Sequence, residues 1–298
     1  MSDTKAPVVL PYELERDIFE LTTRAYPGVG PKLSLVSRYV QAWVETVLYE
    51  TVILEMPHET TDLFLRTFNE RPASFFGRTV KRLHVTNMLS YEDAKRLIEA
   101  CSGAVHVGAW VYPNTFHDNF LPCINTHNLQ RLSMPLEAIW SIKTRPVVFD
   151  PAMFPRLSHL EVVNPPGLYP PLQLDWDNII ALPSLTHLAF GELFSKSHKH
   201  YLPAFERVLQ ERPDLQVLIV VSTDEWITNE IEQNGLDQDA RVVLREDFTK
   251  PVTAAEYWRE VKLGGADMWT RAEDLVPIQQ VRIERTREIY EDLQDLML

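Results

Sequence analysis

The chain has 298 residues, of which 45% are hydrophobic, and its 42 acidic and 29 basic side chains give a formal net charge of -13. This much negative charge, with no run rich in lysine or arginine, argues against a nucleic-acid partner because a phosphate backbone would be repelled. No apolar run comes near the ~18 residues that cross a bilayer, and the start of the chain lacks a secretory signal, so we expect no membrane partner.

Two cysteines, Cys101 and Cys123, fit neither a metal-ligand spacing nor a disulfide framework. We therefore expect a reducing location, cytoplasmic or nuclear. The length suits one extended domain with small additions at its ends.

The first part of the chain is predicted to be a flexible tail (1–9) and then a helical segment (10–54). Pro11 suits the first turn of a helix in which Leu14 and Ile18 share one face. After a stretch rich in proline and glycine, a second amphipathic helix leads into a short apolar strand near residue 54.

One short phrase recurs in the next part, residues 55–250. It reads Leu-x-x-Leu-x-apolar, and the central leucines Leu132, Leu160, Leu188 and Leu218 are separated by 28, 28 and 30 residues. This period is typical of a leucine-rich repeat, in which each copy supplies one strand and a return segment. Weaker copies are centred on Leu83, Val105 and Val242. We expect an α/β fold, an irregular leucine-rich-repeat solenoid of about six or seven strands.

The return segments between the strands are predicted to differ from one another. Ser90 is placed to cap a helix, and Tyr201–Arg212 forms a second helix that stops at a proline. Asn164–Pro171 is rich in proline and is expected to be an extended surface loop. Residues 251–298 change character and are predicted to be a helical C-terminal cap of the repeat array.

Strand alternation predicts which side chains lie on the opposite, concave face of the repeats. The candidate partner-binding residues there are Arg82, His84, His106, Arg131, His159, Glu161 and His187. We expect His84 beside His106, and His159 beside His187. Imidazoles this close resist joint protonation, so the face is expected to titrate near neutral pH. A polar ladder without function and a metal or catalytic site are the alternatives.

Residues 10–54 resemble the F-box motif. The matching features are Leu10-Pro11, Glu13-Leu14, Ile18-Phe19, Leu35-Val36-Ser37-Arg38, Trp43 and the exit from Leu48-Tyr49 to Leu54. An F-box-like segment followed directly by leucine-rich repeats is similar to a large group of fungal proteins. The resemblance implies a substrate receptor of a cullin-type ubiquitin ligase, whose Skp-type adaptor would contact Leu10, Pro11, Leu14, Ile18, Leu35, Val36 and Trp43.

The expected function is therefore protein recognition without catalysis or a cofactor. No phosphate-binding glycine loop, nucleophile elbow or metal-ligand spacing is present in the sequence. The unknown target is expected to offer a basic or mixed-charge surface to the concave face. One alternative is a scaffold whose F-box-like segment only covers the first repeat. The other is an enzyme that uses the histidine-rich face, which requires the proline-rich loop or the C-terminal tail to close a pocket over it.

Overall fold

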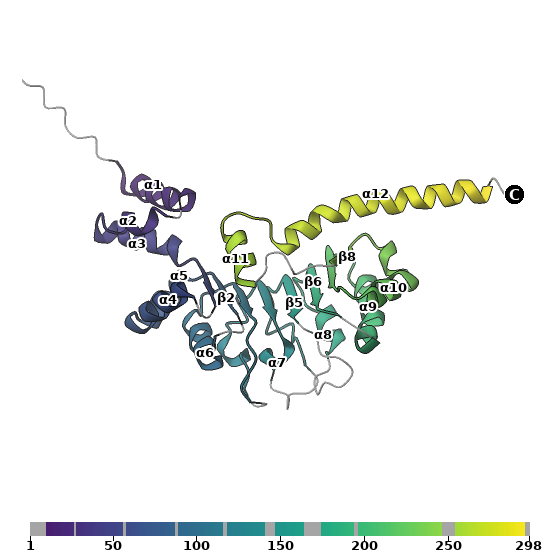
Figure 1. Cartoon of the computed structure of the whole chain (residues 1–298), viewed down its shortest axis with the longest axis horizontal. Helices are drawn as coiled ribbons and strands as arrows, with labels where there is room; N and C mark the ends of the chain where they lie inside the picture. Colours follow the sequence, from purple (N-terminus) through teal and green to yellow (C-terminus); the bar gives the residue numbers. More distant parts are fainter. Residues whose placement is uncertain are drawn as a thin grey trace, which may run out of the picture.

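The computed structural model describes residues 10–26, 28–55, 58–86, 89–115, 118–140, 147–163, 174–193, 196–245 and 254–295. Over these residues the chain is a mixed α/β protein with one eight-stranded sheet and twelve α-helices (Figure 1). The predicted tail (1–9) and the predicted proline-rich loop (164–171) lie outside the described residues. No helix in the described ranges is both long and apolar enough to cross a membrane.

All eight strands are parallel, and each one pairs with the strand that precedes it in the sequence. In order across the sheet they are β1 (Thr51–Leu54), β2 (Arg82–Val85), β3 (His106–Ala109), β4 (Arg131–Met134), β5 (His159–Val163), β6 (His187–Gly191), β7 (Val217–Val221) and β8 (Val242–Arg245). Parallel neighbours require a crossover connection, which the return segments supply.

The repeated leucines form one buried row across the sheet. The strand register places Leu132, Leu160, Leu188 and Leu218 side by side, and each is at most 1% exposed. Alternation then sends the residues on either side of this row to the opposite face. The prediction of these four strands and of their inward side is confirmed.

The predicted register of β3 is wrong by two residues. Val107, and not Val105, continues the buried row. His84 therefore pairs with Gly108 and not with His106, its predicted neighbour. Both registers put His106 on the same face, because a shift of two residues preserves the alternation. In this copy of the phrase, alanines occupy the first and last core positions, where the copies centred on the four leucines have large apolar residues. The sequence match that would give the correct register is therefore weak.

Helices and irregular segments cover the leucine face of the sheet and share one core with it. The helices are α4 (Glu59–Glu70), α5 (Ala73–Thr79), α6 (Tyr91–Ala100), α7 (Leu136–Ile139), α8 (Trp176–Ile180), α9 (Leu202–Glu211) and α10 (Glu225–Gln233). The predicted cap is confirmed, because Ser90 Oγ accepts a hydrogen bond from the Asp93 N–H at 3.1 Å. The predicted helix over Tyr201–Arg212 corresponds to α9.

The N-terminal helices form a small unit at the β1 end of the sheet (Figure 1). They are α1 (Tyr12–Ala25), α2 (Gly30–Leu33) and α3 (Arg38–Leu48). Val40, Trp43 and Val44 make a separate core for this unit. A bidentate pair, in which Arg71 donates to Glu45 at 2.6 and 2.9 Å, ties α3 to the residue that ends α4.

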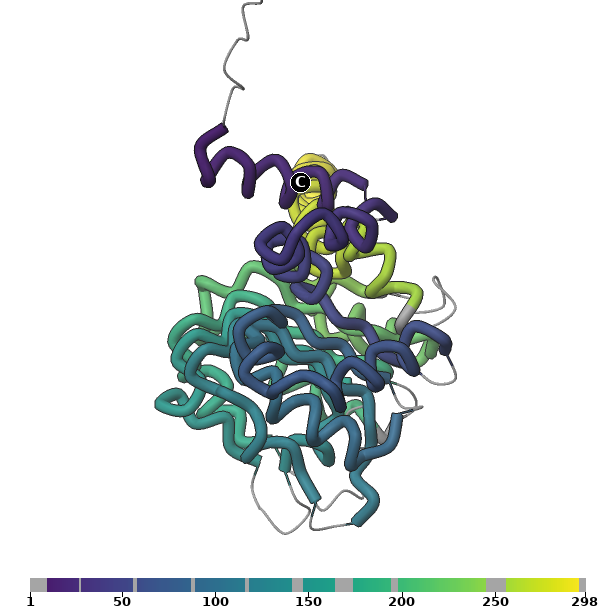
Figure 2. The backbone as a smooth tube through the Cα atoms, turned by 90° about the vertical axis from the view of Figure 1, so that its left-hand side faces the viewer, coloured from purple at the N-terminus to yellow at the C-terminus, as the bar shows by residue number. Residues whose placement is uncertain are grey.

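The C-terminal helices cover the other face of the sheet, which is not where a terminal cap of the last repeat would lie. Helix α11 (Ala254–Lys262) contacts β1 and β2, and the start of α12 (Met268–Asp295) contacts β7 and β8. The rest of α12 projects beyond the body (Figure 1). Figure 2 shows the N-terminal unit and α12 on the same side of the sheet.

Buried arginines join successive return segments on the leucine side. Arg212 is 8% exposed and donates to the carbonyl oxygens of Ile180, Leu182 and Leu185 and to the Asp214 carboxylate. Arg241 makes similar bonds one repeat later, to the carbonyls of residues 209 and 212. These bonds give the carbonyls of the return segments a charged donor.

Replacing Arg212 with methionine should therefore lower the free energy of unfolding by about 3 kcal/mol, because several buried carbonyls and a carboxylate lose a charged donor. Urea unfolding measures this loss. The matched control is Arg207→Met, which removes exposed ion pairs to Asp177 and Glu211 and should cost much less, because solvent screens these pairs. Equal losses in the two variants would contradict the role assigned to Arg212.

Candidate functional site

Polar side chains gather on the face of the sheet opposite the leucines, over β1 to β6. The row before the central leucines contains Thr51, Arg82, His106, Arg131, His159 and His187, and the row after them contains His84, Gly108, Ser133, Glu161 and Ala189. The structure thus brings all seven predicted face residues onto one surface.

The predicted histidine pair of β5 and β6 is confirmed. The rings of His159 and His187 are stacked, with centroids 4.1 Å apart and planes 3° apart. Each Nδ1 lies within hydrogen-bond distance of the preceding hydroxyl, 2.9 Å from Ser158 Oγ for His159 and 2.8 Å from Thr186 Oγ1 for His187. These contacts with the hydroxyl groups fix the orientation of the two imidazole rings relative to the sheet.

Two tryptophans from the C-terminal segment lie directly on the histidines. The Trp258 ring stacks on His84 with centroids 3.7 Å apart and planes 15° apart. Trp269 meets His159 and His187 edge-on, at centroid distances of 5.2 and 5.6 Å. The histidine face is therefore covered and is not an open concave surface.

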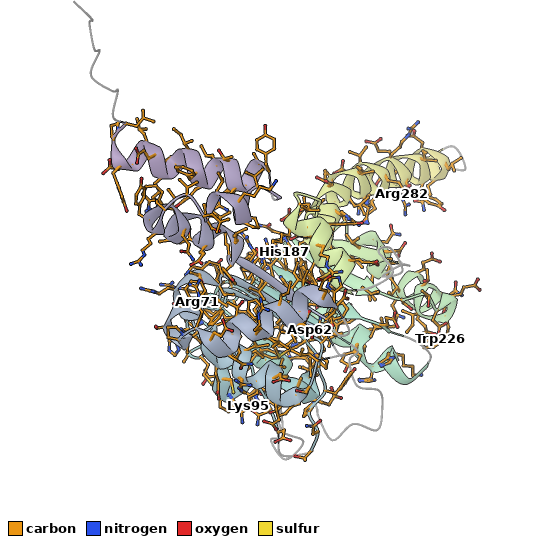
Figure 3. The ribbon with its side chains drawn as sticks, turned by 60° about the vertical axis from the view of Figure 1, so that its left-hand side comes forward. Asp62, Arg71, Lys95, His187, Trp226 and Arg282 are labelled. Carbon is orange, nitrogen blue, oxygen red and sulfur yellow. The ribbon has the colours of Figure 1, made fainter. Side chains whose placement is uncertain are left out.

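Ion pairs and apolar packing hold this cover in place. Arg131 Nη1 donates to Asp267 Oδ2 at 2.6 Å, and His187 Nε2 lies 2.9 Å from Glu273 Oε1 (Figure 3 labels His187). Arg259 Nη2 of α11 also donates to Glu55 at 2.6 Å. An apolar cluster completes the contact: Ala189, Val217, Ile219, Val221 and Val243 from the sheet with Tyr257, Met268, Trp269 and Ala272 from the C-terminal segment.

A cavity of about 320 Å³ remains between the sheet and this cover. Its polar lining combines cationic, acidic and imidazole groups: Thr51, Arg82, His84, His106, Arg131, Ser133, His159, Glu161, Lys262 and Asp267. Its apolar lining includes Trp258, Val261 and Trp269. A volume of this size is at the lower end of the range for small-molecule sites.

Burial keeps the histidines neutral. It lowers the pKa of His84 to about 3, with smaller contributions from His106 and Arg82. It lowers the pKa of His106 to about 4 and that of His159 to about 2, where Arg131 adds to the effect. The pKa of His187 is also lowered by burial, although Glu273 opposes the shift. The expected titration near neutral pH is therefore wrong, because it assumed an exposed face.

The chemistry open to this site is hydrogen bonding and charge recognition. Within the described ranges, no group of three or more His, Cys, Asp or Glu side chains is arranged to hold a metal ion. Neutral imidazoles can donate from one nitrogen and accept at the other. Arg82, Arg131 and Lys262 supply positive charge, and Arg131 is matched by Asp267.

Most residues of the predicted adaptor-binding set lie on the surface of the N-terminal unit. Leu10 is 42% exposed, Leu14 and Ile18 are each 50% exposed, Leu35 is 85% exposed and Val36 is 60% exposed. Pro11, the N-cap residue of α1, is exposed as well. These side chains are available to a partner.

Trp43 differs from the rest of that set because it is only 6% exposed. Its indole Nε1 donates to the Tyr12 hydroxyl at 3.1 Å, and its ring meets Tyr12 and Tyr39 edge-on. The structure therefore gives Trp43 a supporting position beneath the exposed residues.

Sequence reasoning missed the residues that close the cavity. Trp258, Lys262, Asp267 and Trp269 belong to a segment that carries no copy of the repeat, so no phase relates them to the strands. The available signal was local: tryptophans on either side of Gly264-Gly265 in an otherwise charged segment. That pattern indicates a buried contact but does not identify which surface is contacted.

The neutral histidines predict that acid weakens the fold. Below pH 6.5 the unfolded chain takes up protons that the folded chain excludes, so the free energy of unfolding should fall as the pH is lowered from 7 to 5. His159→Gln should make this slope shallower by up to about 1.4 kcal/mol per pH unit, since one such site is removed. Urea unfolding at several pH values measures the slope. A slope unaltered by His159→Gln would contradict the prediction.

No protein-family model, curated protein or solved structure matches this chain.

Proposed function

We propose that this chain is a protein-interaction receptor of the F-box and leucine-rich-repeat kind. In this proposal the N-terminal unit binds a Skp-type adaptor of a cullin-type ubiquitin ligase, and the rest of the chain recognises a target protein. The chain would hold the target protein close to the ligase and would not itself catalyse the making or breaking of a bond.

The exposed apolar side chains of the N-terminal unit carry the proposal. Leu14, Ile18 and Leu21 follow one another at helical spacing on α1, and all three are at least half exposed. Leu35 and Val36 are exposed in the turn between α2 and α3. The unit has its own core, so these five side chains are not needed to hold it together. Apolar groups left unpaired in this way mark an interaction surface.

The attachment of the N-terminal unit also suits a receptor. Arg71 and Glu45 form two charged hydrogen bonds in which the carboxylate is mostly buried. Glu50, which follows α3, accepts from Arg24 at 2.5 Å and from Arg82 at 3.1 Å. Such bonds hold the unit at a fixed place beside β1. A fixed distance between adaptor and target is what transfer to a target lysine requires.

The order of the strands supports the repeat part of the proposal. Each copy of the phrase supplies one parallel strand, and consecutive copies pair in register. The central leucines of neighbouring copies lie side by side in one continuous core, as in repeat proteins. We therefore propose that the mixed α/β body is an irregular leucine-rich-repeat array.

The seven residues predicted to hold the target are only partly available. His84, Glu161 and His187 are buried, and Arg82, His106, Arg131 and His159 are half-buried beneath or beside the C-terminal segment. A target could reach them only after α11 and the start of α12 had moved away. The adaptor contact is thus the better supported half of the proposal, and a scaffold that binds no adaptor is its alternative.

Isothermal titration of the full chain with a purified Skp-type adaptor tests the proposal. We expect a Kd below about 1 μM, and Leu14→Asp and Val36→Asp should each weaken binding at least about tenfold, because a charge would be buried against the adaptor.

Ile278→Asp is the matched control, because Ile278 is 64% exposed but lies on α12. It should leave the affinity unchanged. Absence of binding at micromolar concentrations, or equal losses in all three variants, would overturn the proposal.

A further inference from the structure

We propose that the cavity between the sheet and the C-terminal segment binds a small organic anion that carries a second polar group. This inference goes beyond the receptor function and does not depend on it. Three features of the cavity carry it: a histidine with an unpartnered imidazole nitrogen, a cationic end and an aromatic roof.

The floor is formed by residues of the polar face of the sheet, among them His84 and Ser133. Gly108 and Ser133 follow His84 along one row of the sheet. A Cβ atom on Gly108 would lie 2.7 Å from His84 Nδ1, so any larger residue there would push the imidazole aside. Val107 and Leu132 also line the cavity although their side chains point into the core, so it is their backbone that reaches it. Gly108 itself is needed to seat the His84 ring, which lines the cavity.

His84 Nδ1 is buried and has no hydrogen-bond partner among the described residues. The side chain is only 5% exposed, and Trp258 covers one face of its ring. A buried polar atom without a partner costs about 1–3 kcal/mol. A phenylalanine at this position would keep the stacking and avoid that cost. The nitrogen faces the backbone of Gly108, and because His84 lines the cavity, a rotation of its ring would present the nitrogen to a ligand hydroxyl or carbonyl.

Two cations converge at the β1 end of the cavity. Lys262 Nζ donates to the Thr51 carbonyl at 2.8 Å, and Arg82 Nη1 donates to the Thr51 hydroxyl at 3.1 Å. Arg82 is paired with Glu50, but Lys262 forms no ion pair within the described ranges. Burial lowers the pKa of Lys262, although Glu50 opposes the shift. A carboxylate bound beside Thr51 would offset the repulsion between the two cations. It would also compensate for the desolvation of the buried ammonium.

The remaining lining favours an organic ligand over an inorganic ion. Trp258, Val261 and Trp269 form an apolar roof, and the volume of about 320 Å³ is much larger than an isolated phosphate needs. At the far end Arg131 is already neutralised by Asp267. The expected ligand therefore places its anionic group near Lys262 and its flat body beneath the tryptophans.

Isothermal titration of the full chain with three probes tests the proposal. We expect 2-naphthoate to bind with a Kd below about 1 mM and at least tenfold more tightly than the neutral 2-naphthamide. We expect 6-hydroxy-2-naphthoate to bind more tightly than 2-naphthoate, because its hydroxyl can pair with His84 Nδ1. Lack of 2-naphthoate binding at 1 mM, or equal affinities for the acid and the amide, would overturn the proposal.

Three variants locate the binding. Lys262→Met should weaken 2-naphthoate at least tenfold, whereas Lys95→Met on α6 should not, since Figure 3 places Lys95 at the far side of the body from His187. His84→Phe should raise the melting temperature of the free protein and abolish the advantage of the hydroxyl group. Equal effects of the two lysine variants would overturn the assignment, as would a hydroxyl advantage that persists in His84→Phe.

These outcomes are separable from those of the adaptor experiment. The probes test the cavity in the absence of any adaptor, and Leu14→Asp should bind 2-naphthoate as the unaltered chain does. Failure of one proposal therefore leaves the other standing.

Discussion

A parallel sheet must be covered on both faces, and this constraint shapes the molecule. The return segments cover the leucine face as a direct result of the repeat. On the opposite face, β6 to β8 present Ala189, Val217, Ile219 and Val243, which would be an exposed apolar surface if the chain ended at β8. The C-terminal segment provides the second layer. Because α11 also extends back to β1 and β2, the same layer covers the polar half of the sheet.

Covering the polar strands desolvates their charged and titratable side chains. Ion pairs, hydrogen bonds or a neutral protonation state compensate for this at individual residues. Burial raises the pKa of Asp267, but hydrogen bonds from Thr270 and the pair with Arg131 outweigh it, so the pKa is lowered and the carboxylate stays charged. His187 lies beside Glu273, and burial holds its imidazole neutral together with those of His84, His106 and His159. Truncating Arg131 would leave the Asp267 carboxylate buried without its ion-pair partner, which is far more costly than the pair is stabilising. His84 stands out because its Nδ1 receives no such compensation.

The parts of the fold that the sequence predicts are those that repeat. His159 and His187 occupy the same place in two copies of one phrase, so their stacking follows from the period alone. The register of β3 fails because alanines replace large apolar residues in its copy. The sequence offers the C-terminal tail as one of two segments that could close over the histidine face, but the contacts of that cover cannot be predicted, because Arg131 and Asp267 are 136 residues apart and no period links them. The titration of the histidines is predicted wrongly for the same reason. The positions of the histidines on the sheet are largely predicted correctly, but their burial under the C-terminal segment is not.

The N-terminal unit and the cavity meet at Glu50, which sets how strongly they can influence each other. Glu50 accepts from Arg24 of α1 on one side and from Arg82 at the cavity on the other. Both arginines are about half exposed, so solvent screens these pairs and each contributes at most about 1 kcal/mol. A coupling free energy cannot exceed the interactions that transmit it. Through this contact the two surfaces are therefore largely independent, and a ligand in the cavity would alter adaptor affinity by no more than about fivefold unless it also displaced the C-terminal segment.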